Sequence, residues 1–204
     1  MSWRTEALER VDAAWIGGAG GIGQSSWWRE WSQGIEGAGV EVVRVGRRGG
    51  KSTMLCRLAV AELLWTPART PAGDVLHVAI VSVDRREAAE RLRTIGAMLD
   101  ALGVVDRRAQ VGGLALGVTE RKSSAEAIEL AGDWGVRAVR VFTATVAGVS
   151  GMTCSLALCD EVAKWRDRET GRVVGVSRLF RLNSSLAHRA LYALSHGATD
   201  RLAA

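Results

Sequence analysis

The chain has 204 residues, a length that suits one domain or a domain with a short appendage. Hydrophobic residues make up 48% and charged residues 24%, as in ordinary soluble proteins, and no apolar run approaches the roughly 18 residues that span a membrane. Residues 1–12 lack the apolar stretch of a secretory signal, so we expect a cytoplasmic protein with no membrane partner. The net charge of +5, carried mostly by arginine, suits a polyanion such as DNA, but a GC-rich genome gives the same composition.

The cysteines and histidines indicate no metal site made of protein ligands alone. Cys56, Cys154 and Cys159 are too few and too scattered for a disulfide framework or a zinc site. Cys154 and Cys159 lie in or beside an apolar run, which predicts small buried thiols. The three histidines show no ligand spacing.

The N-terminal part of the chain predicts short helices separated by glycines. In chain order we expect an amphipathic helix over 1–15, a flexible loop over 17–23, a helix that carries three tryptophans and ends near Gly34, and a turn over 36–39.

From residue 40 the pattern changes to apolar strands that alternate with helices. We expect strands over 40–45, 75–83, 111–119, 127–130, 136–142, 155–159 and 190–194, and helices over 51–65, 85–102 and 176–187, with a loop over 66–74 and Asp84 as a helix cap. This alternation predicts an α/β fold with a mainly parallel sheet flanked by helices. We therefore predict a helical, glycine-rich lead-in over 1–38 and an α/β core domain over 39–204.

The strongest motif lies between the strand over 40–45 and the following helix. A phosphate-binding loop needs glycines that turn backbone N–H groups onto an anion, a lysine for the β- and γ-phosphates, and a hydroxyl for Mg²⁺. It also needs a helix N-terminus, whose dipole favours the anion. The run supplies these as Gly46, Arg47, Arg48, Gly49, Gly50, Lys51, Ser52 and Thr53.

This loop is a variant of the standard pattern. The pattern GxxxxGK, followed by Ser or Thr, would place glycine at Val45, so Gly46 comes one position late and two arginines follow it. Arg47 or Arg48 could stabilise charge on the γ-phosphoryl group, or both could be surface charges. We expect Lys51 to be exposed and to contribute little to packing.

The second motif is an apolar strand that ends in two adjacent carboxylates, Asp160 and Glu161. In P-loop ATPases such an aspartate holds Mg²⁺ and a following glutamate can deprotonate the attacking water. The pair follows Lys51 by about 110 residues, with strands between, which strengthens both assignments. The two motifs together predict that residues 39–204 form a P-loop ATPase core. We predict Ser52 and Asp160 as metal-site residues and Glu161 as the general base.

Residues 18–23 match GxGxxG, but a helical segment precedes them where a dinucleotide-binding site requires a strand. We interpret this run as a loop rather than as a cofactor site.

The tryptophans before the phosphate loop allow two interpretations. Trp27, Trp28 and Trp31 could form a stacking surface for adenine or a nucleic-acid base, or they could pack their helix onto the sheet, which we favour. Several ATP-driven nucleic-acid motors place a glutamine upstream of the phosphate loop to recognise adenine, and Gln33 or Gln24 could do so here.

Taken together, these motifs resemble the ATPase domain of tailed-phage terminase large subunits over roughly residues 39–195. The loop resembles the family's G-R-x-x-G-K form, and 158–163 is similar to its apolar-Asp-Glu-x-Ala form. Residues 191–195 resemble the strand whose final Ser or Thr couples hydrolysis to DNA movement, which would make Ser195 the coupling residue.

That resemblance implies an ATP- and Mg²⁺-dependent motor that translocates double-stranded DNA into a procapsid in the bacterial host cytoplasm. It also implies a terminase small subunit and a portal protein as partners, and a possible homo-oligomeric ring. The family normally continues into a nuclease domain, for which we expect no room in this chain, and hence no nuclease activity. A helicase-like or other DNA-remodelling ATPase, or a truncated and inactive nucleotide-binding module, are the alternatives.

Overall fold

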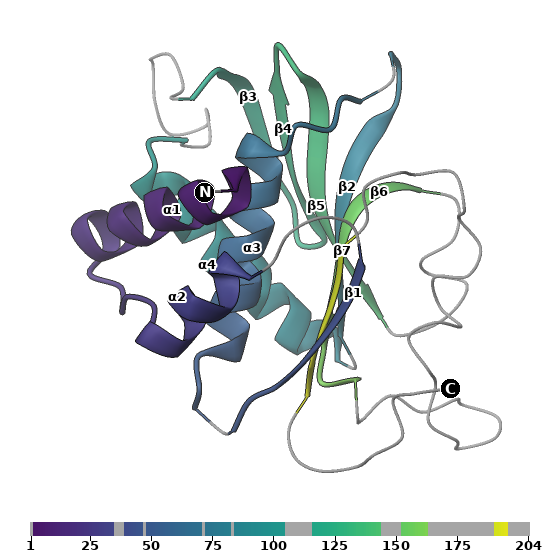
Figure 1. Ribbon diagram of the computed structural model, residues 1–204. Helices are drawn as coiled ribbons and strands as arrows, with labels where there is room; N and C mark the ends of the chain where they lie inside the picture. Colours follow the sequence, from purple (N-terminus) through teal and green to yellow (C-terminus); the bar gives the residue numbers. More distant parts are fainter. Residues whose placement is uncertain are drawn as a thin grey trace, which may run out of the picture.

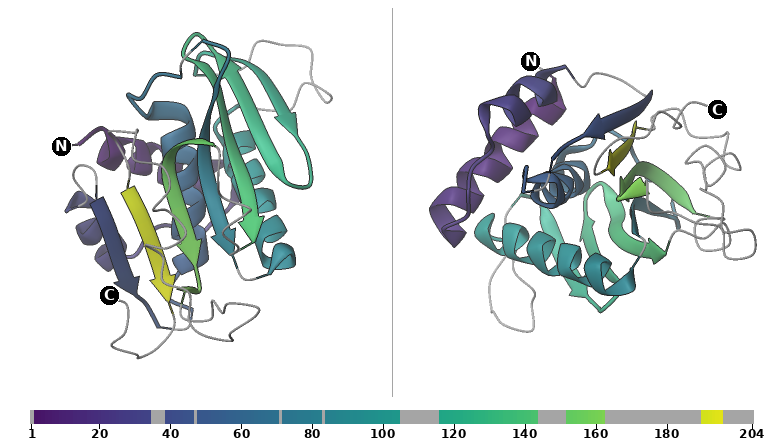
Figure 2. Two further views of the ribbon diagram at one scale, coloured as in Figure 1. Left: turned by 90° about the vertical axis from the view of Figure 1, so that its right-hand side faces the viewer. Right: turned by 90° about the horizontal axis from the view of Figure 1, so that it is seen from below.

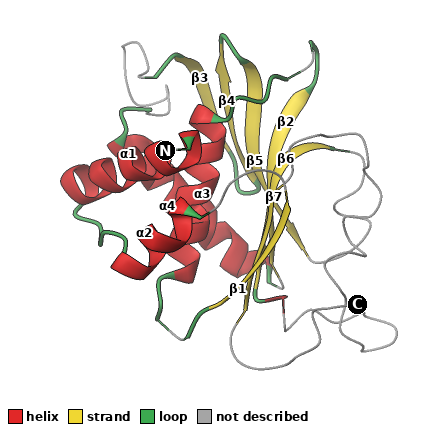
Figure 3. Ribbon diagram, viewed as in Figure 1, coloured by secondary structure: helices red, strands yellow, loops and turns green. Residues whose placement is uncertain are grey.

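The computed structural model describes residues 2–34, 39–46, 48–70, 72–82, 84–104, 116–143, 152–162 and 190–195. Within them, four helices lie on one side of a seven-stranded sheet (Figures 1 and 3). The helices are α1 (Trp3–Ala19), α2 (Ser26–Gln33), α3 (Lys51–Trp65) and α4 (Arg85–Ala101). The strands are β1 (Gly39–Arg44), β2 (Val75–Ser82), β3 (Val118–Ser123), β4 (Ala127–Gly132), β5 (Gly135–Thr143), β6 (Thr153–Asp160) and β7 (Ala190–Ser195).

The sheet has the strand order β1-β7-β6-β2-β5-β4-β3. The first five strands in this order are parallel to one another, whereas β4 pairs antiparallel with both β5 and β3. Arg44 pairs with Ser195, and Asp160 pairs with Leu194, so the carboxyl ends of β1, β7 and β6 meet at one edge. Ligands of open parallel sheets bind at this edge, where the order of strands departs from the order of the sequence.

Helix α3 forms the centre of the core because it lies between the sheet and the outer helices. It contacts β2, β5 and β6 on one side and α1 on the other, and it lies beside α4, which also packs on the sheet (Figure 2). Its side chains are therefore buried nearly all round, among them Leu55, Leu58 and Leu63. This explains why the sequence of α3 is apolar on almost every face, as expected for a helix without a solvent side.

Two buried ion pairs join α1 to α3. Arg57 pairs with Asp12 at 2.8 Å and Arg4 pairs with Glu62 at 3.2 Å, and all four side chains are at least nine-tenths buried. Ala7, Leu8 and Val11 of α1 also belong to the core cluster. The N-terminal segment thus packs directly on the helix that follows the glycine-rich loop, and the boundary at residue 38 stays a prediction.

The flexible loop predicted over 17–23 is partly wrong, because α1 continues through Gly17 and Gly18 to Ala19. The helix ends where Gly20 adopts a left-handed φ of 63° and its N–H bonds to the Trp15 carbonyl. The Trp15 ring then folds over Gly21, where a Cβ would lie only 1.9 Å from the indole nitrogen. Glycine therefore terminates the helix here, and no strand precedes the GxGxxG run.

Most other predicted elements agree with the structure to within a few residues. The exception is the strand expected over 111–119: residues 111–115 lie outside the described residues, 116–117 form a turn, and the described strand spans Val118–Ser123. The helix expected over 176–187 and residues 36–38 of the expected turn lie outside the described residues. None of the described helices is long and apolar enough to cross a membrane.

Candidate active site

The glycine-rich loop connects β1 to α3 at the carboxyl edge of the sheet. The Gly49 N–H donates to the Gly46 carbonyl at 3.2 Å, and a Cβ on Gly49 would lie 2.3 Å from Val45 Cγ1. Gly50 precedes the helix with a left-handed φ of 76°, and no side chain caps the helix start. The loop is thus a tight turn that requires glycine and leads into an uncapped helix N-terminus, which is a site suited to an anion.

Lys51 and Glu161 meet at this edge although about 110 residues separate them in sequence. Lys51 Nζ donates to Glu161 Oε1 at 2.6 Å, and less than a tenth of each side chain is exposed. Glu161 follows the end of β6 with a left-handed φ of 53°, which is uncommon for a residue other than glycine. That backbone turn carries Glu161 away from the strand and towards the loop lysine, and unusual backbone of this kind often marks functional sites.

The expectation that Lys51 is exposed is wrong. Lys51 is buried, and its side chain contacts the carboxylate of Glu161, which is itself buried. The pair therefore contributes to the fold as well as to the site, since neither charge has water as its main partner.

Asp160 forms a separate ion pair with Arg91, which the sequence analysis did not identify. The Arg91 guanidinium donates from Nη2 and Nε to Asp160 Oδ2 at 2.9 Å and 3.3 Å, and Asp160 is 1% exposed. The available signal was that Arg91 lies on the apolar face of α4, three residues after Ala88 and four before Ile95. An arginine on a buried helix face needs an acidic or carbonyl partner, and Asp160 is that partner.

The other residues of the predicted site lie at the same edge where the structure describes them. Ser52 and Thr53 occupy the first turn of α3 and are partly buried. Ser195 ends β7 and pairs with Arg44 at the end of β1. Its backbone therefore lies between β1, which leads into the glycine-rich loop, and β6, the acidic strand that ends at Asp160. Arg48 is exposed with a left-handed φ of 61°, and Arg47 lies outside the described residues.

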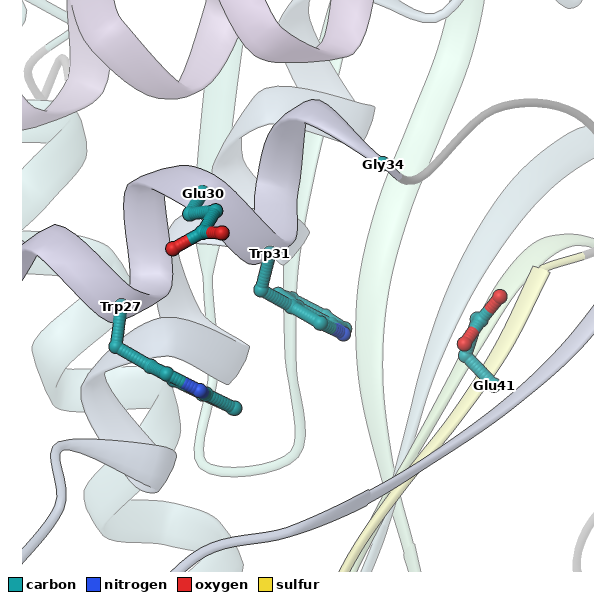
Figure 4. Close-up of a pocket in the computed structure, with 5 residues that line it drawn as sticks. All are labelled: Trp27, Glu30, Trp31, Gly34 and Glu41. Atoms are coloured by element: carbon teal, nitrogen blue, oxygen red, sulfur yellow. The ribbon is translucent and has the colours of Figure 1, made fainter.

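A hollow of about 450 Å³ lies between α2 and β1, the strand that leads into the glycine-rich loop (Figure 4). Its lining residues are Trp27, Glu30, Trp31, Gly34 and Glu41. The rings of Trp27 and Trp31 are nearly parallel, and that of Trp27 is about half exposed. Two indole faces and two carboxylates suit a planar ligand that carries amino groups, because the carboxylates accept hydrogen bonds and the rings stack.

The two glutamines considered for adenine recognition lie in different surroundings. Gln24 is buried, its side-chain amide donates to the Leu8 carbonyl at 3.5 Å, and its backbone N–H donates to Asp12. Gln24 therefore supports the α1–α2 connection. Gln33 is exposed at the last position of α2 and is not among the residues that line the hollow.

Solved structures provide a comparison for this arrangement. The HK97 bacteriophage large terminase superposes with a TM-score of 0.60 and 15% sequence identity, covering 92% of this chain and 37% of that one. A mutant of the Thermus phage P74-26 large terminase ATPase domain gives a TM-score of 0.53 and 13% identity, covering 80% of this chain and 62% of that one. The chain has the fold of a phage terminase ATPase domain. No family model matches the sequence, and no curated protein matches it either.

The fold class predicted from the sequence is therefore confirmed, and so is the likeness to terminases at the level of the fold. The chain spans about a third of the HK97 protein and under two thirds of the P74-26 domain. Activities and partners of whole terminases are consequently proposals for this chain.

The thiols of two buried cysteines in this terminase-like fold, Cys56 and Cys159, are unreactive. Burial raises the pKa of Cys56 to about 12, and Cys56 Sγ donates to the Arg91 carbonyl at 3.6 Å. Burial likewise raises the pKa of Cys159 well above its usual value. Both remain protonated at neutral pH, so neither is a nucleophile or a thiolate ligand. Cys154 is only partly buried, contrary to the expectation from the sequence.

The residues at the edge fit Mg²⁺ only with help from a ligand. The described part of the chain contains no group of three or more His, Cys, Asp or Glu residues that could hold a metal ion. A hydroxyl on Ser52 and a carboxylate on Asp160 are hard oxygen donors of the kind that Mg²⁺ prefers. Such a short donor set is typical of Mg²⁺ sites in which substrate phosphates and waters complete the coordination.

We expect Arg91→Gln to raise the Mg²⁺ concentration needed for half-maximal nucleotide binding. Outer-shell partners that orient a ligating carboxylate commonly contribute about 10- to 100-fold to metal affinity. Affinity for ATP in the presence of EDTA should change little, because the hydrogen bonds of the Arg91 guanidinium go to the predicted metal-site residue Asp160. Fluorescence titrations with a nucleotide analogue at fixed Mg²⁺ concentrations measure both quantities.

Arg93→Gln is the matched control, because Arg93 lies on the same helix with its side chain 76% exposed. An Arg91→Gln protein that is less stable but keeps the wild-type Mg²⁺ midpoint would show that Arg91 serves folding alone.

Proposed function

We propose that this chain is the ATP-hydrolysing motor domain of a viral DNA-packaging terminase. The observation that carries the proposal is the Lys51–Glu161 contact, because it joins a glycine-rich loop to the acidic strand in a terminase-like fold. In P-loop ATPases these two positions bind the phosphates and activate the attacking water.

The glycine-rich loop would hold the triphosphate. Backbone N–H groups of the loop and the uncapped start of α3 would face the phosphates, and Lys51 would contact the β- and γ-phosphates. Mg²⁺, when bound, would neutralise negative charge that develops during phosphoryl transfer. Ser52 and Asp160 would hold it, and Arg47 or Arg48 would contact the γ-phosphate.

Glu161 would act as the general base for hydrolysis. In the structure the Lys51 ammonium donates to the Glu161 Oε1 oxygen at 2.6 Å. When Lys51 moves to the phosphates, that oxygen becomes available to orient a water and to accept its proton. This movement of Lys51 from Glu161 to the phosphates would make the general base available only when nucleotide is bound in the loop, so that hydrolysis follows binding.

The hollow beside α2 would receive the adenine ring. Trp27 and Trp31 would stack on the base and Glu30 or Glu41 would accept hydrogen bonds from its amino group. Gln33 at the end of α2 is our proposed additional adenine contact, after a rotation of its exposed side chain.

Coupling to DNA would pass through Ser195 at the end of β7. The backbone of Ser195 lies between β1, which leads into the loop, and β6, which ends at Asp160. Double-stranded DNA, a terminase small subunit and a portal protein would be the partners, and a homo-oligomeric ring at the procapsid in the bacterial host cytoplasm would be the working assembly.

The direct test is phosphate release by the purified chain with Mg²⁺ and ATP, with and without double-stranded DNA. We expect measurable turnover that rises when DNA is added. Nucleotide binding without turnover in either condition would favour an inactive nucleotide-binding module. The absence of any ATP binding at millimolar concentration would contradict the proposal.

A further inference from the structure

We infer that Trp28 is a positioning residue for the phosphate loop, which it holds through its indole N–H. The inference rests on the proposed nucleotide-binding function and adds a residue of the N-terminal segment to that site. Trp28 is 4% exposed, and its Nε1–H donates to the Gly49 carbonyl at 2.7 Å. The bond joins α2 to the loop across about 21 residues of sequence.

The bond determines which way the loop amide points. A trans peptide is planar, so the carbonyl of Gly49 and the N–H of Gly50 point in opposite directions. Because the carbonyl faces Trp28, the Gly50 N–H faces away from α2. The Gly49 N–H is already engaged with Gly46. Trp28 therefore sets the orientation of the next amide, one of those expected to cradle the phosphates.

Gly50 shows how closely the ring approaches the backbone. Its φ of 76° is a left-handed conformation, and a Cβ at this position would lie 3.3 Å from Trp28 Nε1. The loop thus requires glycine for its backbone angle and also accommodates the indole beside it. A side chain here would push against the group that donates the hydrogen bond.

Neighbouring rings hold the indole in place. Trp28 packs edge-on against Trp27 at 4.7 Å and against Trp31 at 5.2 Å between ring centroids. The helix itself begins at the Ser25 cap, and the Ser32 carbonyl accepts from the Thr5 hydroxyl of α1 at 3.4 Å. The donor is therefore fixed before any ligand arrives, which lowers the entropic cost of ordering the loop on binding.

Trp28→Phe tests the inference because phenylalanine keeps an aromatic ring and removes the N–H. A neutral hydrogen bond of this kind corresponds to roughly a three- to tenfold change in affinity, so the dissociation constant for Mg·ATP should rise by about that factor. Titration calorimetry measures the affinity and thermal unfolding measures the stability of the same samples.

The matched control is Trp134→Phe, at the turn between β4 and β5, where the strands meet the opposite edge of the sheet. Trp134 is partly buried, and its ring packs with the Arg137 guanidinium. Its replacement should leave ATP affinity unchanged. Equal affinities for wild type and Trp28→Phe would overturn the inference alone, whereas a wild-type protein that binds no ATP would overturn the proposed function with it.

The wild-type protein gives a second measurement that does not depend on a variant folding. The Nε1–H signal of Trp28, once assigned in a nitrogen-15 spectrum, should exchange slowly with solvent and should shift when Mg·ATP is added. A signal that exchanges rapidly with solvent and does not shift when Mg·ATP is added would overturn the inference.

Discussion

Replacement of Glu161 with glutamine should stop ATP hydrolysis and leave a protein that still binds Mg·ATP. Glutamine has nearly the shape of glutamate and its amide oxygen can accept from Lys51, but it cannot take a proton from water. Loss of a general base commonly lowers the rate by about a hundredfold to ten-thousandfold. Phosphate release at saturating ATP, together with a binding titration, separates the rate effect from the affinity effect.

The control for this variant is Glu129→Gln on β4, where the glutamate is partly exposed in a loose pair with Arg140 at 3.8 Å. It should hydrolyse ATP like the wild type. Because an isolated motor can be slow, the comparison should be made with double-stranded DNA present. Wild-type turnover by Glu161→Gln would mean that another group activates the water.

The glycine-rich loop and the acidic strand could be located from sequence because their chemistry is local. Glycines, a lysine and a hydroxyl must follow one another if a strand is to turn into a helix around an anion, and that order is visible in residues 46–53. A buried strand that ends in Asp160 and Glu161 is equally visible. The meeting of the two motifs follows from the rule that carboxyl ends of parallel strands share an edge.

The partners of these residues were not visible because they depend on packing between helices. Arg91 contacts Asp160 only because α4 lies against the sheet, and Trp28 reaches Gly49 only because α2 rests on α1. Sequence spacing shows that Arg91 lies on an apolar face, but not which acid it meets. For Trp28, the sequence suggested packing or ligand stacking, and the structure shows a third role, a hydrogen bond to the Gly49 carbonyl of the loop.

Two errors in the predicted elements have simple physical causes. The expected strand over 111–119 does not include most of β3 because the residues of β3 are largely polar, as expected for an antiparallel strand with one solvated face. Arg121 of β3 is nevertheless buried, because it contacts Asp100 and two backbone carbonyls. Helix α1 continues beyond its expected end because Gly17 and Gly18 do not interrupt it. Glycine costs a helix only about 1 kcal/mol per residue, which packing against α3 and α4 can offset.

Lys51→Ala should abolish ATP binding and also destabilise the fold. The binding loss follows from removal of the cation that would face the phosphates. The stability loss follows from burial, because the buried Glu161 carboxylate would lose the Lys51 cation that contacts it. Breaking a buried ion pair at one end typically costs about 3 to 5 kcal/mol. Urea unfolding measures the second effect and calorimetry with Mg·ATP measures the first.

The double variant Lys51→Ala, Glu161→Gln separates the two effects. Glutamine carries no charge, so the second substitution should restore much of the stability that Lys51→Ala loses, whereas ATP binding should stay absent. Lys122→Ala is the matched control: its pair with Glu120 is mostly exposed, and such pairs contribute at most about 1 kcal/mol. If Lys51→Ala were as stable as the wild type, the buried contact with Glu161 would not exist in solution. If it bound ATP with wild-type affinity, Lys51 would not be the phosphate-binding lysine, and the loop would lose its assigned role.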